Sequence, residues 1–362
     1  MNTAPLTPLQ RFAAYGRGDS IDRLPCVPII GNGSARLIGA RISALRGNGL
    51  LIAEAQIAAY RAFNYDVIRV FTDLYQMGEA MGATVHYPED ETAYLDAPAI
   101  TSVEEIGRII PLSPWSDGNL PAHLEAMKRV VDAVGAEVPV TGAVTCPFTI
   151  ASFLIGAETL VRLTLKNPEK VHELCEIALE SALRYCEAII STGASPSLTD
   201  PMSSTTVISP RLFREFSFPY LKRLIDYIHS RGKSVTLHIC GKTAKIWEFM
   251  VDAGADCLSI DNEASLVDAK HTIGDRARIM GNVRPSEIML QGTPAHVRQA
   301  VIACIAQAWD SPKGYIVASG CSLPTEAPFE NIRAMMDAVT EIGWPICPDR
   351  LQALTKQYQE DL

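Results

Sequence analysis

His238 and Cys240 are the side chains whose types and spacing point most directly to chemistry, in the stretch SVTLHICGKT. They stand two residues apart at the end of an apolar run. On a β-strand, residues at i and i+2 project from the same face. An imidazole nitrogen and a thiolate are both ligands that Zn2+ prefers. The stretch therefore predicts half of a metal site, and the alternative is a buried strand that ends in two polarisable residues.

Cys321, in the stretch SGCSLPTEAP, is the candidate third ligand because it ends another predicted strand. One histidine and two cysteines would leave the fourth position of a tetrahedral zinc open for substrate, which is typical of a catalytic site. Cys146 ends a further predicted strand and could replace Cys321, or could close the site as a fourth ligand. A closed site would indicate a zinc-stabilised binding protein. Spacing alone leaves these alternatives open.

The elements that must position these residues are short β-rich runs that alternate with helix-length segments. Eight strands are predicted, at residues 27–30, 67–73, 138–146, 195–200, 234–240, 257–262, 277–283 and 315–321. Several helices should begin at a cap followed by proline, as at Asn167-Pro168 and Thr293-Pro294. Apolar strands that alternate with helices predict a parallel sheet, and eight such units predict a closed (β/α)8 barrel. A doubly wound open sheet is the alternative, although no G-x-G-x-x-G follows the first strand.

One barrel domain is expected over residues 26–362, preceded by an N-terminal arm at residues 1–25. The insert MGATVHYPEDETAYLDAPAI follows the second predicted strand and is too irregular for a barrel helix. It is predicted to form a hairpin or a loop.

The ends of the predicted strands carry polar side chains almost without exception. In a barrel, chemistry gathers at the C-terminal ends of the strands. These ends read, in order, Asn32, Asp73, Thr145 with Cys146, Asp200, His238 with Cys240, Asp261, Asn282 and Cys321. Each residue can ligate, titrate or form hydrogen bonds, so we expect them to surround one mouth.

The alternative for each single position is that turns require polar residues. Asp73, followed by Gln76, would also make a helix N-cap with a capping box. Asp200 before Pro201, and Asn282, would likewise shape turns. Glu79 follows Asp73 by six residues and would simply face solvent.

Composition excludes several classes of protein. The 362 residues are 48% hydrophobic and 20% charged, which is an ordinary globular composition. A net charge of −9, with no basic cluster among aromatic residues, argues against nucleic-acid binding. The chain begins without a basic segment or an apolar signal core, and the uncharged run 138–157 contains prolines and glycine, so no membrane span is expected. Nine cysteines without a C-x-x-C pair fit a reduced cytoplasmic protein.

The stretches LHICG, GNVRP and SGCSLPTEAPFENI resemble the uroporphyrinogen decarboxylase superfamily, as do DPMSSTTVISPRLFREFSFPYLKRL and GAVTCPFTIASFLIG. More narrowly, they resemble its zinc- and corrinoid-dependent methyltransferase branch, of the methylcobamide:coenzyme M methyltransferase type. The resemblance covers nearly the whole chain. It implies a (β/α)8 barrel and a zinc ligand set of His238, Cys240 and Cys321, which match the H-x-C…C pattern of that branch.

The decarboxylase proper uses no metal, and its functional aspartate matches Asp73 in FTDLYQMGEAMGATV. Its arginine-rich segment, which holds the carboxylates of the substrate, has no match in VPIIGNGSARLIGARI. The resemblance therefore favours methyl transfer, and decarboxylation of a tetrapyrrole without metal is the alternative.

What the resemblance implies is transfer of a methyl group between a corrinoid and a small molecule bound at zinc. That molecule would be a thiol acceptor, or an O- or N-methyl donor such as a methyl ether. The chain shows no corrinoid motif, so a separate corrinoid protein is the expected partner. The candidate catalytic residues are Asp73, Glu79 and Asp200, and the candidate substrate-binding residues are Asn32, Thr145, Asp261 and Asn282. Oligomeric state is left open.

Overall fold

The computed structural model describes residues 5–360, and all eight predicted strands form within it, with shorter bounds than predicted. They are β1 (Cys26–Val27), β2 (Ile68–Val70), β5 (Val140–Thr145), β6 (Ser195–Thr199), β7 (Thr236–Ile239), β8 (Cys257–Ile260), β9 (Arg278–Val283) and β10 (Tyr315–Ser319). Every residue of β8 and of β10 is buried. Burial on both faces explains why these strands read as nearly continuous apolar runs.

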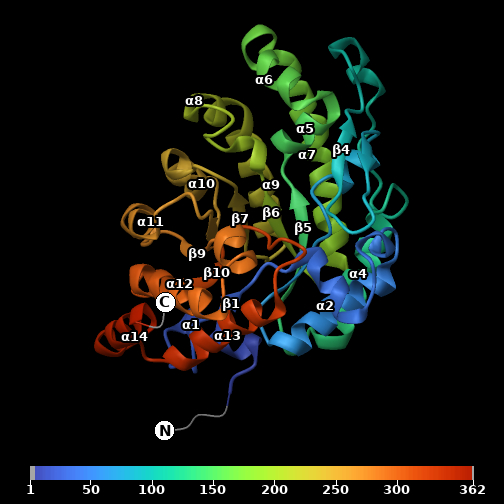
Figure 1. The fold of residues 1–362 in the computed structure, drawn as a ribbon. Coiled ribbons are helices and arrows are strands. Elements are labelled where there is room, and N and C mark those ends of the chain that lie inside the picture. The colour runs from blue at the N-terminus through green and yellow to red at the C-terminus, as the bar shows by residue number, and fades with distance from the viewer. Residues whose placement is uncertain (1–4, 361–362) are drawn as a thin grey trace.

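The eight strands form one parallel sheet in the order β1-β10-β9-β8-β7-β6-β5-β2. Its first and last strands approach each other, because the Asp66 N–H, just before β2, donates to the Cys26 carbonyl of β1 at 2.9 Å. The sheet is therefore curled into a (β/α)8 barrel, as predicted. Figure 1 shows its arrowheads pointing toward the side on which α5, α6 and α8 extend.

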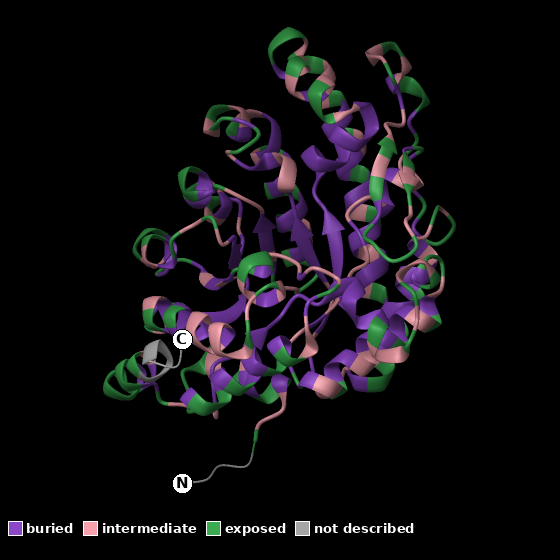
Figure 2. Ribbon diagram, viewed as in Figure 1, coloured by how far each residue is buried: buried purple, intermediate pink, exposed green. Residues whose placement is uncertain are grey.

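Helices surround the sheet. They are α1 (Pro8–Arg17), α2 (Gly49–Phe63), α3 (Gln76–Ala80), α4 (Leu120–Val134), α5 (Pro147–Ile155), α6 (Ala157–Lys166), α7 (Pro168–Ser191), α8 (Pro210–Leu212), α9 (Phe218–Ser230), α10 (Trp247–Asp252), α11 (Leu266–Ile273), α12 (Pro294–Ala308), α13 (Phe329–Ile342) and α14 (Pro348–Glu360). Figure 2 shows the buried positions on the strands and on the helix sides that face them. No single helix among residues 5–360 is long and apolar enough to cross a bilayer. The one pair that meets the length and composition test, α5 with α6, bends by 105°, and α5 is buried throughout.

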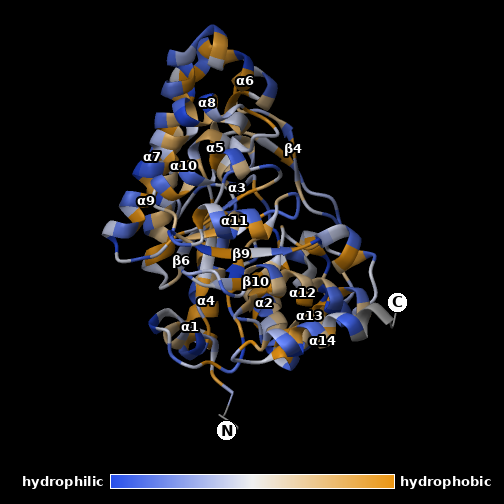
Figure 3. Ribbon diagram, turned by 90° about the vertical axis from the view of Figure 1, so that its left-hand side faces the viewer, coloured by the Kyte–Doolittle hydropathy of each residue, from blue (hydrophilic) through white to orange (hydrophobic). Residues whose placement is uncertain are grey.

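The insert after β2 forms an antiparallel hairpin, as predicted, from β3 (Thr84–His86) and β4 (Tyr94–Ala97). The segment that follows β4 contacts α5, because the Ile100 N–H donates a hydrogen bond to the Leu154 carbonyl at 2.8 Å. The N-terminal segment lies at the opposite end of the molecule, with α1 near the bottom of Figures 1 and 3. Residues 1–4 of the predicted arm lie outside the described residues.

Asp66 closes the seam between β1 and β2 with buried charges. Its carboxylate is fully buried and pairs with Arg11 of α1 and, at 2.6 Å, with Arg23. It also accepts a hydrogen bond from the Cys26 N–H at 2.7 Å. Both arginines are themselves buried, so each buried charge in this cluster has a partner. Breaking such a pair costs about 3–5 kcal/mol, because it leaves a buried charge uncompensated.

Candidate metal centre

His238, Cys240 and Cys321 meet at the C-terminal ends of the strands. His238 is the third residue of β7, Cys240 follows that strand directly, and Cys321 stands two residues after β10. One ligand atom from each of the three lies within 4.8 Å of the others. His238 Nε2 is 3.1 Å from Cys240 Sγ, and the two sulfur atoms are 3.8 Å apart. Two thiolates on a tetrahedral zinc would be separated by about 3.7 Å, given bonds of about 2.3 Å. The donor set and the spacing both fit that ion.

The imidazole of His238 is oriented by its other nitrogen. Nδ1 lies 3.1 Å from the carbonyl oxygen of Ser259 and 3.1 Å from its hydroxyl. Ser259 is the register partner of His238 on the neighbouring strand β8. Donation from Nδ1–H to the carbonyl leaves the Nε2 lone pair directed at the sulfur atoms, which is the usual way a protein orients a metal-binding histidine.

Asp261 holds the turn that carries Cys240. Its carboxylate accepts hydrogen bonds from the N–H of Gly241 at 2.8 Å and of Glu263 at 2.9 Å. Gly241 has φ +70°, and a Cβ there would meet the Thr206 hydroxyl at 2.7 Å, so the turn requires glycine. Asn282 supports the same region, since its amide donates to the carbonyl of Asp261 at 3.0 Å. Asp261 and Asn282 thus surround the ligands rather than joining them.

The backbone before Cys321 is equally constrained. Gly320 N–H donates to the Val283 carbonyl at 2.8 Å. A Cβ on Gly320 would lie 2.7 Å from the backbone nitrogen of Asn262. Close approach of two backbones therefore fixes where the Cys321 thiol points.

The two thiols influence each other's ionisation. The hydrogen bond from Cys240 lowers the pKa of Cys321, although burial acts in the opposite direction. The same contact is the largest reason that the pKa of Cys240 is raised, with burial second. The pair of thiols therefore releases one proton easily and retains the other. A cation bound between the two sulfur atoms would displace that remaining proton.

Cys146, the alternative ligand, does not join this group. It is fully buried, and its backbone N–H donates to the backbone carbonyl of Thr199 at 3.0 Å. Burial raises the pKa of its thiol well above the ordinary value. Among the described residues, the metal-ligating group therefore has three members and no fourth cysteine.

Asp73 lies elsewhere on the mouth and holds the turn that leads into α3, whose N-cap residue is Tyr75. One carboxylate oxygen accepts from the N–H groups of Tyr75 at 2.8 Å and Gln76 at 3.0 Å. The Gln76 amide donates to the Asp73 carbonyl at 3.3 Å, whereas in a capping box it would accept from the Asp73 N–H. The other carboxylate oxygen accepts from Thr72 at 3.0 Å, and His123 Nε2 lies 2.6 Å from the Thr72 hydroxyl.

Asn32 and Thr145 lie near Asp73. The Asn32 amide donates to the Thr72 carbonyl at 2.6 Å, and its Oδ1 is buried without a partner. Asp73 and Asn32 border a small cavity of about 30 Å³. Thr145 donates its hydroxyl to the Leu74 carbonyl at 2.9 Å.

Glu79 and Asp200 are both committed to neighbours. Glu79 does not simply face solvent, because it accepts from the Tyr87 hydroxyl at 2.7 Å, the Asn119 amide at 2.8 Å and Arg46 at 3.1 Å. Asp200 is almost fully buried and accepts from three hydroxyls, those of Thr149, Ser203 and Ser217, at 2.5–2.9 Å. Burial raises the pKa of Asp200 while these hydrogen bonds lower it. Neither side chain contacts the three metal-ligand candidates.

Sequence reasoning missed Ser259, Gly320 and Arg69. Ser259 stands two residues before Asp261. Because side chains alternate along a strand, Ser259 could have been placed on the same inner face as Asp261. Gly320 and Arg69 carried no local signal. Arg69 is the central residue of β2, and its Nη2 donates to the Thr199 hydroxyl at 2.5 Å inside the barrel.

The family model for uroporphyrinogen decarboxylase (URO-D) matches residues 7–342. The methylcobamide:CoM methyltransferase MtaA of Methanosarcina barkeri is 28% identical, over 91% of this chain and 97% of its own length. The uroporphyrinogen decarboxylase of Psychromonas ingrahamii is 27% identical, over 82% of this chain and 85% of its own.

Among solved structures, a methyltransferase from Methanosarcina mazei superimposes with a TM-score of 0.84 at 25% identity, covering 93% of this chain and 99% of that one. The family match spans most of the sequence, and the structural match spans nearly all of the barrel. The chain therefore belongs to the uroporphyrinogen decarboxylase family.

Proposed function

We propose that the protein is a zinc-dependent methyltransferase that moves a methyl group between a corrinoid and a small molecule bound at zinc. His238, Cys240 and Cys321 would hold the ion. The observation that carries the proposal is the meeting of one imidazole and two thiols within 4.8 Å, at the end of the barrel where chemistry gathers. The relatives named as methyltransferases support it, and the metal-free decarboxylase chemistry gives no reason for such a cluster.

Zinc bound to these three residues would lower the pKa of a substrate thiol and so supply a thiolate at neutral pH. The two cysteine thiolates donate charge to the ion, which keeps a bound substrate sulfur nucleophilic, so we favour a thiol as the acceptor. The proposed reaction would form a carbon–sulfur bond on the substrate and break the cobalt–carbon bond of the corrinoid, whose electron pair would stay with cobalt. The thiol proton leaves to solvent or to a nearby base.

The residues of this chain provide orientation. Ser259 holds the imidazole of His238 in the tautomer that presents Nε2. Asp261 holds the turn after Cys240 through the Gly241 N–H. In this proposal Asp73, Glu79 and Asp200 orient the substrate or carry its proton, and Asn32, Thr145 and Asn282 line its binding site.

The corrinoid would arrive on a separate protein that covers the mouth. In Figure 1 the strands point toward the side on which α5, α6 and α8 extend, and Figure 3 shows α6 and α8 at that upper end. We propose that these elements border the docking surface, because a cobalt atom must approach the open side of the zinc.

The test is transfer of the methyl group from methylcobalamin to a panel of thiols, measured as the loss of methyl–cobalt absorbance. The zinc content of the purified protein is measured alongside it. We expect about one zinc per chain and transfer to at least one thiol. Cys321→Ala should lose zinc and at least about 100-fold in rate, because loss of an orienting neighbour alone costs 10–100-fold. The matched control is Cys347→Ala, since Cys347 is exposed and lies outside the cluster.

Methyl ethers and methylamines, offered with cob(I)alamin, test the reverse direction in the same assay. Full activity without zinc, or an unchanged rate in Cys321→Ala, would contradict the proposal. So would release of carbon dioxide from uroporphyrinogen at a rate that does not depend on zinc.

A further inference from the structure

The barrel interior holds a cavity of about 720 Å³ that extends below the metal-ligand candidates at the mouth. Its inner end is lined by His238, Ser259 and Arg69. Its outer end is lined by Ser234 and Lys313, which precede β7 and β10 and are exposed. The cavity therefore opens at the N-terminal ends of the strands, on the side opposite Cys240 and Cys321, neither of which lines it.

The cavity exists because the side chains that point inward are small. Inward positions of such barrels are normally filled by valine, isoleucine and leucine, which make a packed core. Here most of the inward positions that line the cavity on four neighbouring strands are hydroxyl residues, namely Thr141, Ser195, Ser197, Thr236 and Ser259, joined by His238 and Cys257. The hydroxyl side chains are too short to fill the centre.

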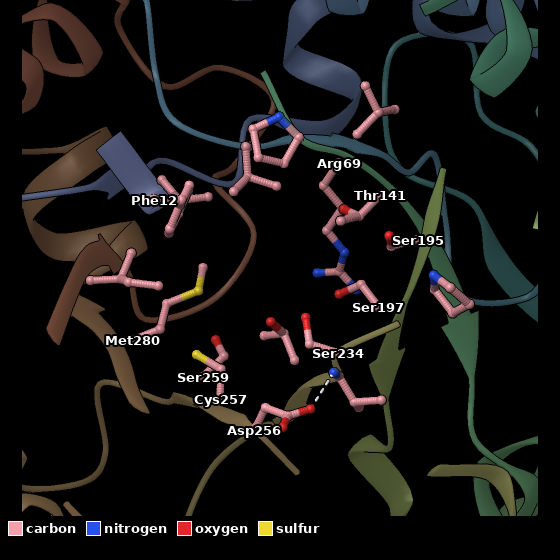
Figure 4. A pocket seen from close by; sticks show the side chains of 18 of the residues that line it. Phe12, Arg69, Thr141, Ser195, Ser197, Ser234, Asp256, Cys257, Ser259 and Met280 are labelled. Carbon is pink, nitrogen blue, oxygen red and sulfur yellow. Dashed lines mark hydrogen bonds between the residues drawn. The ribbon is translucent and has the colours of Figure 1, made fainter. Parts of the chain in front are cut away.

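The two walls of the cavity differ in chemistry. One wall is apolar, formed by a second hydrophobic cluster that is separate from the main core; its members in the cavity are Val27, Ile29, Cys257, Met280 and Ile316, with Phe12 and Val67 packed against them. The other wall carries Arg69, Thr141 and Ser197. Figure 4 shows Arg69 projecting into the cavity from this second wall, with Met280 and Phe12 on the opposite side.

Arg69 is a half-buried cation that has no carboxylate partner among the described residues. Its guanidinium lies over the Phe71 ring, 5.1 Å from the ring centroid. Burial lowers the pKa of Arg69, and the nearby thiols of Cys321 and Cys240 raise it. Apart from the bond to Thr199, its guanidinium has no hydrogen-bond partner among residues 5–360, and its Nε is fully buried.

Two other arginines show the contrast. Arg11 and Arg23 are buried, but both pair with Asp66. A guanidinium cannot shed its proton, so burying one without an anion is costly.

The opening of the cavity is also cationic. Arg278 and Lys313 line it, and neither has a carboxylate partner among the described residues. Asp256, the acidic residue there, accepts hydrogen bonds from His229 and from the Val235 N–H, both at 2.7–2.8 Å. On a chain of net charge −9, this opening would attract anions.

We propose that the interior cavity binds a small organic carboxylate with an apolar body. The carboxylate accepts hydrogen bonds from the free guanidinium nitrogens of Arg69 and from the hydroxyl of Ser197, whereas the Thr141 hydroxyl already donates to the Ile68 carbonyl. The body packs against Val27 and Met280 on the opposite wall. The planar guanidinium matches a carboxylate in geometry, and the cavity volume lies in the ordinary range for small-molecule sites. The cavity opens at the other end of the barrel from the proposed methyl-transfer site, and the two sites meet at His238, which lines the cavity and is a metal-ligand candidate.

The test is isothermal titration of the full chain with hexanoate, and with 1-hexanol and phosphate as the matched neutral and inorganic probes. Hexanoate should bind with one site per chain and more tightly than either control. Arg69→Met, which keeps the length of the side chain and removes its charge, should weaken hexanoate at least tenfold and leave hexanol unchanged. Arg223→Met is the matched control, because Arg223 is exposed and pairs with Glu176 at the surface.

Two further variants separate this proposal from the metal site. Ser197→Leu should block hexanoate by filling the cavity, whereas Cys321→Ala should retain it while losing zinc. If Arg69→Met fails to fold, the comparison of hexanoate with hexanol on the unaltered protein decides alone. No saturable hexanoate binding, tighter binding of phosphate or hexanol, or equal affinity in folded Arg69→Met would overturn the proposal.

Discussion

The mouth of the barrel and its interior are built from the same inward-facing strand positions but treat polar side chains differently. At the mouth, Asp261, Asn282 and Asp200 all have hydrogen-bond partners. In the interior, Arg69 keeps two nitrogens without partners beside an open space. Asp261 and Asn282 hold the turn that carries Cys240, whereas Asp200 is bound by three hydroxyls away from the metal-ligand candidates. The Oδ1 of Asn32 is the exception at the mouth, since it is buried without a partner. The unsatisfied group of the interior is available to a molecule that the chain does not supply.

The sharpest way to separate the two regions is to remove a metal-ligand candidate. Cys240→Ala should reduce methyl transfer at least 100-fold and abolish stoichiometric zinc, because two remaining ligands bind zinc weakly. Hexanoate affinity should stay within about twofold. Zinc analysis and titration on the same preparation give both results. Loss of both activities together would show that the two regions form one site.

A smaller effect is expected from the residue that positions Cys240. Asp261→Asn places an amide N–H against the N–H of Gly241 or of Glu263, so one hydrogen bond is lost. We expect zinc affinity to fall about 10–100-fold, as for other residues that orient a ligand. Competition with a chromophoric chelator measures it. Asp268→Asn, at an exposed position in α11, should leave the affinity as it is.

The interior should respond in the opposite direction when its charge is removed. Arg69→Met should raise the free energy of unfolding by at most about 1–2 kcal/mol, since replacing a half-buried charge that has no carboxylate partner with an apolar side chain relieves its desolvation. Arg11→Met should lower it by about 3–5 kcal/mol, because it leaves the buried carboxylate of Asp66 with one cation fewer. Urea unfolding measures both. If the two variants lowered the free energy of unfolding equally, the charge of Arg69 would be stabilised by a partner as strongly as that of Arg11.

The smallest effect concerns pH. Burial raises the pKa of Asp200 in the folded chain above its value near 3.9 in the unfolded chain. The folded state then binds the proton more tightly, so this contribution to stability is present below about pH 4 and is lost as the pH rises through the folded pKa. Asp200→Asn should remove that contribution. Across this pH range, the difference in the free energy of unfolding between the two proteins should change by about 1.4 kcal/mol for each unit by which the pKa of Asp200 is raised. A difference that does not depend on pH would contradict this prediction.

Much of the fold could be predicted because it depends on neighbouring residues. Eight apolar runs separated by helix-length segments indicated the barrel, and the hairpin after β2 followed from its irregular insert. Strand ends were placed too far along the chain, since the last polar residues of each run, such as Asp73 and Asp200, belong to the following turns. Their hydrogen bonds with α3 and with nearby hydroxyls come from residues that the sequence does not show to be close.

By itself, the sequence determined that His238 and Cys240 share one face of a strand, because side-chain direction alternates along any strand. Only the tertiary structure decided that Cys321 lies 3.8 Å from Cys240, that Ser259 orients His238, and that Arg69 lacks a carboxylate while Arg11 has one. These facts depend on which strands lie side by side once the barrel closes, and residues far apart in the chain carry no local record of it.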